Sequence, residues 1–369
     1  MNILHVSAVK SWGGGENHIE NLCRELSTKS PDTAHTIICA KGGLFQKKLK
    51  HAELPHIAVK LAFKMDPRFS LKVIEICRSK KIDLVHIHDS TALTLCIMGD
   101  HLSNLPPFIF SKKTTFPIRP RKQTLYKYNY EKIKKILCVS EATKKMTAEM
   151  VLRPEKLACI YHGTNVHCEE NNSPLQLRSK LKLKENIKLI GNIANHNWPK
   201  DLETFILTAN EVINIQQKED IHFVQIGAFT NRTAAYLKKI KDLALEDHIS
   251  FIGKISNAAA LIPQFNISLM TSKSEGIPQF IYESFLKKIP VISTNVGGIS
   301  EIIEHNNNGF LADAGDYRTL ANFITELLND PEKSNQFTAF SYKLVLEKYT
   351  TEIMAQKTLN QYKTVLHGR

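Results

Sequence analysis

Short apolar runs alternate along the whole chain with stretches of helical periodicity, and this alternation restricts the fold more than any other feature. In the first half, the runs that predict strands are residues 2–7, 36–40, 57–61, 84–88, 108–111, 136–139 and 157–161. In the second half, they are residues 189–194, 223–227, 249–252, 267–270 and 291–293. Runs this short that are apolar on both faces favour parallel strands covered by helices. Two sets of such units predict an α/β protein with two doubly wound, Rossmann-like domains.

The chain of 369 residues is long enough for two domains. A polar segment, residues 167–186, separates the two sets of strands, so we expect domains at residues 1–170 and 171–350. The last 35 residues lack strand patterns, and we expect their final helix to return to the first domain, which would then include residues 351–369. Ligands of doubly wound sheets bind outside the carboxyl ends of the strands. Two such domains facing each other predict a central cleft.

The seven cysteines are scattered along the chain without a C-x-x-C pair. This argues against a disulfide scaffold or a zinc site and indicates a reducing compartment. The first residues, MNILHVSAVKSWGGGE, lack the long apolar run of a signal peptide. No stretch approaches the roughly 18 uninterrupted apolar residues of a membrane-spanning helix. We therefore expect a cytoplasmic protein.

The net charge of +13 is unevenly distributed. Residues 1–170 contain 27 Lys and Arg against 16 Asp and Glu, a net of +11, whereas the remainder has a net of +2. The densest part, residues 112–135, has nine basic residues and one acid. This run is either a solvated face or a surface for anions such as nucleic acid, lipid head groups or acidic glycans. It has no recognition-helix or base-stacking pattern, so we expect an anionic membrane surface rather than nucleic acid.

A glycine-rich loop, SWGGGENH (residues 11–18), follows the first predicted strand and opens the first helix. Its spacing is not the G-x-G-x-x-G of dinucleotide-binding proteins. Three consecutive glycines allow backbone amides to approach an anion at a helix start. The alternative is a flexible turn without a ligand.

Two histidines, His86 and His88, lie on one face of the strand predicted at residues 84–88. His88 is nearer the carboxyl end and is the better candidate for a ligand contact. A buried, hydrogen-bonded histidine is the commoner outcome for either residue. A metal site would need a third ligand, and the sequence offers no evident one.

Two acids frame a glycine and a proline in SEGIPQFIYESF (residues 274–285), directly after a predicted strand. Pro278 is favoured at the first position of a helix, so we expect the amides near it to form an anion site. Glu283 lies about 7.5 Å further along such a helix, within reach of hydroxyls on the same ligand. Glu275 precedes the helix and is placed for hydroxyls on the other side.

Lys200 precedes a helix expected from Leu202, after the first strand of the second half. A lysine at a helix start is well placed to meet a phosphate as a point charge. Taken alone, it is an ordinary loop lysine. Together with the two acids, it predicts a diphosphate site flanked by carboxylates for hydroxyl groups.

These motifs resemble those of the retaining glycosyltransferases of the GT-B fold, family 4 (glycosyltransferase group 1), over nearly the full chain. Glu275 and Glu283 match the E-x7-E motif of the family, and residues 13–16 match its G-G-x-E loop. Further matches are VSEAT (139–143), IYHGTNV (160–166) and PVISTNVGGISEII (290–303). The resemblance implies metal-independent transfer of a sugar from a UDP- or GDP-sugar, with no cofactor beyond this substrate.

The resemblance also implies roles for individual residues. Lys200 would stabilise the departing diphosphate, Glu275 would contact the donor sugar, and both would be catalytic. The loop of residues 13–15 would close over the phosphate from the other domain. The donor-binding residues would be Gly13, Gly14, Gly15, Asn192, Lys200, Gly227, Lys254, Gly276, Ile277, Pro278, Gln279 and Glu283, the last on the ribose. The acceptor-side residues would be Glu16, His18, His88, Lys112 and Lys113.

The chain departs from the family pattern at two places. Asn192 stands where many members have an arginine that meets the diphosphate, and His196 or Lys254 would have to replace it. Basic residues Lys112 and Lys113 stand near the place of a common histidine, so no acid–base histidine is assigned.

The sequence thus predicts a glycosyltransferase that acts on a cell-envelope glycan or a lipid-linked saccharide, in the cytoplasm or at the inner face of the membrane. A sugar-nucleotide epimerase of the same fold is one alternative. A non-catalytic sugar-nucleotide-binding protein is another, because of the two departures.

Overall fold

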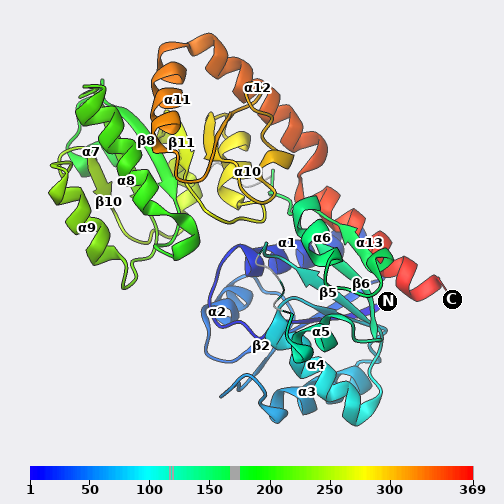
Figure 1. Ribbon diagram of the computed structural model, residues 1–369. Helices are drawn as coiled ribbons and strands as arrows, with labels where there is room; N and C mark the ends of the chain where they lie inside the picture. Colours follow the sequence, from blue (N-terminus) through cyan, green and yellow to red (C-terminus); the bar gives the residue numbers. More distant parts are fainter. Residues whose placement is uncertain (116–117, 119, 167–174, 369) are drawn as a thin grey trace. The chain divides into compact units, whose positions relative to one another are not determined.

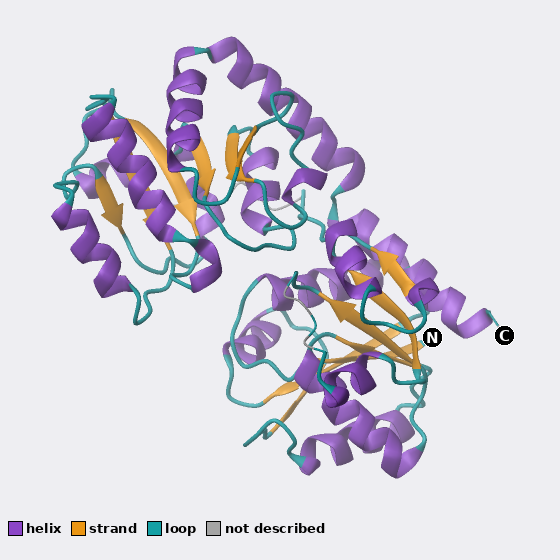
Figure 2. Cartoon of the chain, viewed as in Figure 1, coloured by secondary structure: helices purple, strands orange, loops and turns teal. Residues whose placement is uncertain are grey.

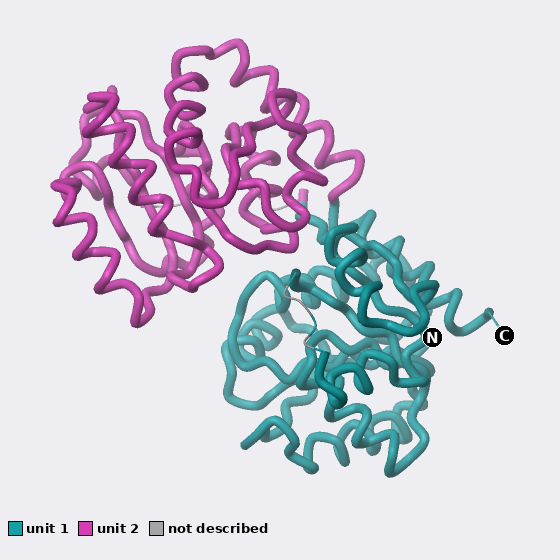
Figure 3. The backbone as a smooth tube through the Cα atoms, viewed as in Figure 1, with its two compact units in different colours: residues 1–165, 350–369 teal, residues 166–349 magenta. Residues whose placement is uncertain are grey.

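The computed structural model describes residues 1–115, 118, 120–166 and 175–368. It divides into two compact units, residues 1–165 with 350–369 and residues 166–349 (Figure 3). The boundaries expected at residues 170 and 351 lie beside these. Residues 167–174 of the predicted linker and Arg119 of the basic run lie outside the described residues.

The first unit contains a seven-stranded parallel sheet in the order β3-β2-β1-β4-β5-β6-β7. Its strands are β1 (Asn2–Val6), β2 (Ala34–Ala40), β3 (His56–Val59), β4 (Leu84–Ile87), β5 (Phe108–Lys112), β6 (Ile133–Cys138) and β7 (Leu157–Cys159). Its helices are α1 (Gly14–Lys29), α2 (Leu44–His51), α3 (Pro67–Ser79), α4 (Ser90–Ser103), α5 (Lys122–Tyr128), α6 (Glu141–Ala148) and α13 (Thr351–His367). Helices cover both faces of the sheet (Figures 1 and 2).

The two faces of this sheet have different partners, as the alternation of side chains along a strand requires. Leu4 and Val6 of β1 pack in a cluster with residues of α3 and α4. Ile3 of the same strand packs instead with Leu22 of α1 and with Tyr362 of α13. The final helix therefore belongs to the first unit, which confirms the predicted return.

The second unit contains a six-stranded parallel sheet in the order β10-β9-β8-β11-β12-β13. Its strands are β8 (Lys188–Ile193), β9 (Ile221–Ile226), β10 (Ile249–Phe251), β11 (Ile267–Met270), β12 (Val291–Thr294) and β13 (Phe310–Ala312). Its α-helices are α7 (Leu177–Leu181), α8 (Leu202–Asn210), α9 (Thr233–Asp242), α10 (Gln279–Leu286), α11 (Tyr317–Asn329) and α12 (Pro331–Lys348). The sequence analysis missed β13, the strand at the edge of this sheet.

Each sheet reverses its winding direction once, between β1 and β4 in the first unit and between β8 and β11 in the second. The loops that follow these strands spread apart at the carboxyl edge, which is where doubly wound proteins bind ligands. The glycine-rich loop, His88, Lys200 and Glu275 all follow these four strands. In the described part of the chain, no helix has the length and apolar character needed to span a bilayer.

Candidate functional site

In the second unit, the loops after β8 and β11 bring Lys200 and Glu275 into contact. The ammonium nitrogen of Lys200 lies 2.6 Å from Glu275 Oε1, and the Ser272 hydroxyl donates to the same oxygen at 2.7 Å. The backbone joins the two loops as well, because the Lys273 amide donates to the Pro199 carbonyl at 2.7 Å. The two residues predicted to be catalytic therefore form one ion pair at the carboxyl edge of this sheet.

Helix α10 begins close to Glu275 in the chain, one residue later than predicted. Pro278 is the N-cap, with an extended backbone (φ −75°, ψ 136°), and Gln279 is the first helical residue. The side chain of Pro278 itself makes no capping hydrogen bond. Gly276 is fixed by a hydrogen bond from the Gly298 amide to its carbonyl at 3.0 Å, and Ile277 is buried. The amino end of α10 can therefore receive an anion, as predicted for this segment.

Glu283 lies on the second turn of α10, partly removed from water. Burial raises the pKa of its carboxyl group from 4.5 to about 7, although Lys287 acts in the opposite direction. Its side chain makes no hydrogen bond to another residue that the structure describes. A carboxylate without such a partner can accept hydrogen bonds from ligand hydroxyls, which is the role predicted for it.

Asn192 and His196 are both enclosed by the protein. The Asn192 side chain is 1% exposed and donates through Nδ2 to the Leu269 carbonyl at 2.8 Å, joining β8 to β11. His196 uses Nδ1 with the Thr233 hydroxyl at 2.8 Å and Nε2 with Gln225 Oε1 at 2.7 Å. Neither side chain is presented to a ligand, so the geometry does not support Asn192 as a diphosphate contact or His196 as its replacement. Asn192 is enclosed because alternate side chains of a covered strand point into the packing of the sheet, whereas His196 lies in the loop after β8 and is held by Thr233 and Gln225.

Lys254 remains as the candidate replacement for the missing arginine. It is exposed and follows β10, the strand beside β9 in the sheet. Gly227, at the end of β9, packs so tightly that an added Cβ would lie 1.8 Å from the Ala194 carbonyl oxygen. The Gly227 amide donates to the Gly253 carbonyl at 3.0 Å. Gly227 therefore allows close packing of the three strand ends, and its predicted contact with the donor stays a prediction.

In the first unit, the lysine directly after β5 holds the glycine-rich loop. The ammonium of Lys113 donates to the Gly15 carbonyl at 2.8 Å. Burial lowers the pKa of Lys113 to about 8, while the charges of Glu16 and Asp89 act to raise it. Burial raises the pKa of Glu16, while the charge of Lys113 lowers it. The predicted acceptor-side residues Glu16 and Lys113 thus form one electrostatic group with the loop.

Lys112 is separate from this group. Its side chain is 5% exposed, and its ammonium donates to the hydroxyl of Thr114 at 3.0 Å. Burial lowers the pKa of Lys112 to about 8. Because it is enclosed, Lys112 takes no direct part in a surface for anions.

Six histidines gather on the α1 and α13 side of the first sheet. The register pairs His5 of β1 with His86 of β4, so the two lie on neighbouring strands. Their shared property is that burial lowers the pKa of each imidazole. The group consists of His5, His18, His35, His86, His88 and His162.

Three of these histidines approach the geometry of a metal site. Ring nitrogens of His5, His86 and His88 all lie within 4.8 Å of one another, so the structure supplies the third residue that the sequence did not reveal. However, His86 already uses both ring nitrogens, with the Tyr362 hydroxyl at 2.6 Å and the Ser111 hydroxyl at 2.8 Å. The positive charge of Lys113 also lowers the pKa of all three rings, and the same repulsion opposes a divalent cation. We therefore assign the cluster to hydrogen bonding.

Asp89 is a positioning residue that the sequence analysis missed. Its Oδ1 accepts hydrogen bonds from the amides of Thr91 and Ala92, which caps α4, and its Oδ2 accepts one from the Ala8 amide at 2.8 Å. It thereby ties the loop after β1 to the loop after β4. An aspartate directly before a helix was the available sequence signal.

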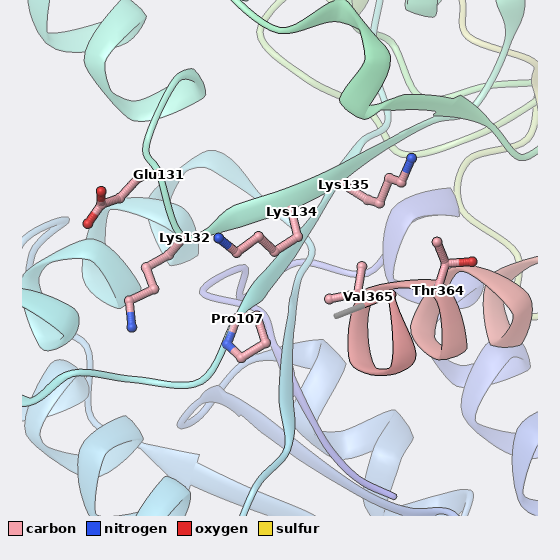
Figure 4. Close-up of a pocket in the computed structure, with 8 residues that line it drawn as sticks. Pro107, Glu131, Lys132, Lys134, Lys135, Thr364 and Val365 are labelled. Carbon is pink, nitrogen blue, oxygen red and sulfur yellow. The ribbon is translucent and has the colours of Figure 1, made fainter.

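The basic run of residues 112–135 does not form one surface, because its elements lie at different ends of the sheet. Lys112 and Lys113 are enclosed at the end of β5, whereas β6 starts at the opposite edge beside a pocket of about 620 Å³. This pocket is lined by Pro107, Glu131, Lys132, Lys134, Lys135, Thr364, Val365 and Gly368. Figure 4 shows the ammonium groups of Lys132, Lys134 and Lys135 pointing in different directions. Lys132 also donates to the Leu105 carbonyl at 2.7 Å, so the pocket is not a convergent anion site.

Comparison with known proteins gives matches to both units. The family model of the Glycosyl transferases group 1 matches residues 173–344, and that of Glycosyltransferase Family 4 matches residues 12–167. N-acetyl-alpha-D-glucosaminyl L-malate synthase from Bacillus anthracis is 22% identical over 308 residues, 82% of this chain and 79% of that protein. UDP-Gal:alpha-D-GlcNAc-diphosphoundecaprenol alpha-1,3-galactosyltransferase from Escherichia coli is 20% identical over 291 residues, 75% and 74% of the two chains.

Solved structures share the fold over the whole chain. A glycosyltransferase from Rickettsia africae has a TM-score of 0.84 at 21% identity, covering 100% of this chain and 99% of that one. Anabaena HepE, solved in complex with UDP-glucose, has a TM-score of 0.84 at 18% identity, covering 99% of this chain and 100% of that one.

Proposed function

Because the chain belongs to the group 1, family 4 glycosyltransferases of the GT-B fold, we propose that it transfers a sugar from a UDP- or GDP-sugar to an acceptor hydroxyl with retention at the anomeric carbon. The acceptor is a cell-envelope glycan or a lipid-linked saccharide. The observation that carries the proposal is the Lys200–Glu275 pair at the carboxyl edge of the second sheet, next in the chain to the start of α10.

The charges of this site fit a departing nucleoside diphosphate. When the bond between the anomeric carbon and the phosphate oxygen breaks, negative charge grows on the diphosphate. The ammonium of Lys200 and the amides at the start of α10 stabilise that charge without a metal ion. Lys254 supplies a further cation in place of the arginine of other members.

The carboxylates serve the neutral parts of the donor. Glu283 accepts hydrogen bonds from the ribose hydroxyls, and Glu275 contacts the donor sugar. In the reaction, the acceptor oxygen forms the new bond to the anomeric carbon on the face that the diphosphate leaves, and the acceptor proton passes to a phosphate oxygen. The predicted closure of the Gly13–Gly15 loop over the phosphate would involve both units, and it stays a prediction.

The relatives support this choice of substrates. HepE was solved with UDP-glucose, and the Escherichia coli relative is named as a galactosyltransferase that uses UDP-Gal with a lipid diphosphate acceptor. We carry the nucleotide-sugar donor and an acceptor of the cell envelope over to this chain.

The experiment combines donor screening with product analysis. We expect one UDP- or GDP-sugar from a panel to raise the melting temperature and to release its nucleoside diphosphate, and we expect NMR of the product to show the anomeric configuration of the donor. Without an added acceptor, formation of an epimerised donor would identify an epimerase instead.

A matched pair of variants tests the role of Lys200. Lys200→Ala should lower kcat by about 10²–10³-fold, as for loss of one charge-stabilising donor. Lys239→Ala, which removes the ion pair of Lys239 with Glu203, should leave kcat unchanged. Donor binding without any turnover by the unaltered protein would support the non-catalytic alternative.

A further inference from the structure

A hydrogen-bonded turn after β3 carries an exposed apolar tip. Asp66 is fully buried and organises the turn: its Oδ2 accepts from the Ala62 amide at 2.9 Å, and its Oδ1 accepts from the Arg68 amide at 3.2 Å. The Asp66 amide also donates to the Phe63 carbonyl at 3.2 Å. The residues between, including Met65, are therefore held outward by the backbone.

The side chains at this tip are apolar and exposed. Phe63 is 59% exposed and Met65 is 55% exposed, and Leu71 on the next turn of α3 is 56% exposed. Large apolar side chains that gather on a surface mark a site of interaction, whereas single ones need no explanation. Both Phe63 and Met65 come from a turn only five residues long, so they form one small apolar projection.

Positive charge surrounds this projection. Residues 60–72 contain four basic residues, which are Lys60, Lys64, Arg68 and Lys72. Arg68 is paired with the buried Asp66 at 2.6 Å and Lys72 with Glu75 at 2.5 Å, whereas Lys60 and Lys64 are exposed. The surface of the turn is therefore apolar at its tip and cationic around it.

The turn leads into α3, and α3 packs against α4. Burial lowers the pKa of Lys127 on α5, while the charge of Asp89 acts to raise it and that of Lys64 acts to lower it. Lys127 donates to the hydroxyls of Ser90 and Thr94, both at 3.1 Å, at the first turns of α4. Helices α3, α4 and α5 lie together on one side of the first unit (Figure 1). The turn follows β3, and Asp89 follows β4, in the same parallel sheet. Both therefore lie at the carboxyl edge of that sheet, where the candidate acceptor residues lie.

We infer that the 62–66 turn docks the first unit onto an anionic lipid bilayer, with Phe63 and Met65 entering the head-group boundary and Lys60 and Lys64 meeting lipid phosphates. An apolar tip with cations around it matches a surface that is apolar below and anionic above. A soluble polyanion would satisfy the cations but would leave Phe63 and Met65 in water. The inference rests on the proposed function in one respect, since a lipid-linked acceptor explains why docking lies at the acceptor edge.

The test is flotation of the purified full-length protein with vesicles of phosphatidylcholine alone or mixed with phosphatidylglycerol. We expect binding to the anionic vesicles at about 0.15 M salt. The double variant Phe63→Ser/Met65→Ser should bind them at least about tenfold more weakly, because burial of apolar area is lost. Lys64→Ser should bind about fivefold more weakly, in a salt-dependent manner. Equal binding by the unaltered protein and the double variant would overturn the inference.

A matched control is available in the same unit. Leu152 is 84% exposed and lies outside this turn, so Leu152→Ser should bind vesicles as the unaltered protein does. In addition, tryptophan emission of Phe63→Trp should shift to the blue on anionic vesicles, whereas that of Leu152→Trp should not. A shift produced equally by soluble polyphosphate would assign the surface to polyanions and overturn membrane docking.

Two variants distinguish a failure of the docking inference from a failure of the proposed function. Phe63→Ser/Met65→Ser should keep the melting temperature and the lipid-free release of nucleoside diphosphate. Lys200→Ala should lose that release and still bind anionic vesicles. Loss of vesicle binding in Lys200→Ala would contradict an independent docking surface.

Discussion

The ammonium of Lys200 and the carboxylate of Glu275 meet at 2.6 Å, although 75 residues separate them in the chain. The Ser272 hydroxyl binds the same carboxylate oxygen, so Glu275 is held by two partners. The cation that we assign to the diphosphate is thus already neutralised within the protein. When the diphosphate of a donor reaches Lys200, it must share the ammonium with Glu275 or displace Glu275 from it. Lys200 would thus exchange one anionic partner for another.

Replacing Glu275 by glutamine separates the two roles of this carboxylate. Glu275→Gln keeps the size of the side chain but frees the charge of Lys200, so UDP or GDP without a sugar should bind as tightly as before or several-fold more tightly. Turnover should fall at least about tenfold, because the contact to the donor sugar is weakened. Calorimetric titration and initial rates measure the two effects. Glu203→Gln, which breaks the pair with Lys239, is the control. Weaker nucleotide binding in Glu275→Gln would contradict the neutralising role.

Glu283 should make nucleotide binding depend on pH. Its pKa is about 7 in the folded protein, so the carboxylate that accepts ribose hydroxyls is lost as the pH falls from 8 to 6. We expect the affinity for the nucleoside diphosphate to fall over that window. Glu283→Gln should bind the nucleoside diphosphate about tenfold more weakly at pH 8. The pH dependence that remains should be that of the ligand phosphates alone. An unchanged affinity at pH 8 would exclude the ribose contact.

The Glu283 carboxyl group should also make the stability of the protein depend on pH, in the opposite direction to nucleotide binding. Because burial raises the pKa above its value of 4.5, the folded state binds the proton more tightly than the unfolded state. The free energy of unfolding should therefore decrease as the pH rises from about 4.5 through 7. Glu283→Gln should lack this decrease and should melt above the unaltered protein at pH 8, which calorimetry would detect.

Replacement by alanine should reduce stability at one glycine, Gly227, but not at another, Gly13. Gly227→Ala places a Cβ 1.8 Å from the Ala194 carbonyl oxygen, so the second unit should be destabilised by about 2–4 kcal/mol. Gly13→Ala meets only the Glu16 carboxylate at 3.6 Å and has an extended backbone, so the melting temperature should be retained. If the loop approaches a ligand with its backbone, Gly13→Ala should nevertheless lower turnover. Normal turnover in Gly13→Ala would exclude a close approach by that residue.

The buried histidines should make the first unit sensitive to acid. Burial lowers the pKa of His5, His18, His86 and His88 well below 6.5, so the unfolded state binds more protons than the folded state below that pH. Stability should fall as the pH decreases from about 6.5, by up to ~1.4 kcal/mol per pH unit for each histidine. Calorimetry from pH 7.5 to 5 should show the larger decrease in the transition of the first unit. Replacing His5 by glutamine should reduce the slope, and a slope unchanged in that variant would show that His5 does not contribute to it.

Much of the fold could be predicted because strands and helices leave short-range patterns. Apolar runs of three to six residues identified all the strands except β13, and the boundaries of the units lie beside those expected. The predicted start of α8 at Leu202 is confirmed, and α10 begins one residue after Pro278. These features depend on side chains that are neighbours in the chain.

The candidate site could be predicted only in part. Motif spacing and the end of a strand marked Glu275, Glu283 and Lys200 as candidates, and the structure brings Lys200 and Glu275 together. Nothing local distinguishes Asn192, whose amide joins β8 to β11 across 77 residues, from an asparagine that faces a ligand.

The sequence by itself determined which segments become strands and helices, and therefore the two parallel sheets and the edges at which ligands bind. Only the tertiary structure decided which residues meet there: Lys113 with Gly15 across 98 residues, and His5 with His86 through strand register. The physical reason is that backbone periodicity is fixed by residues a few positions apart. Contacts between strand ends depend instead on the order of the strands in the sheet, which no short window of the chain contains.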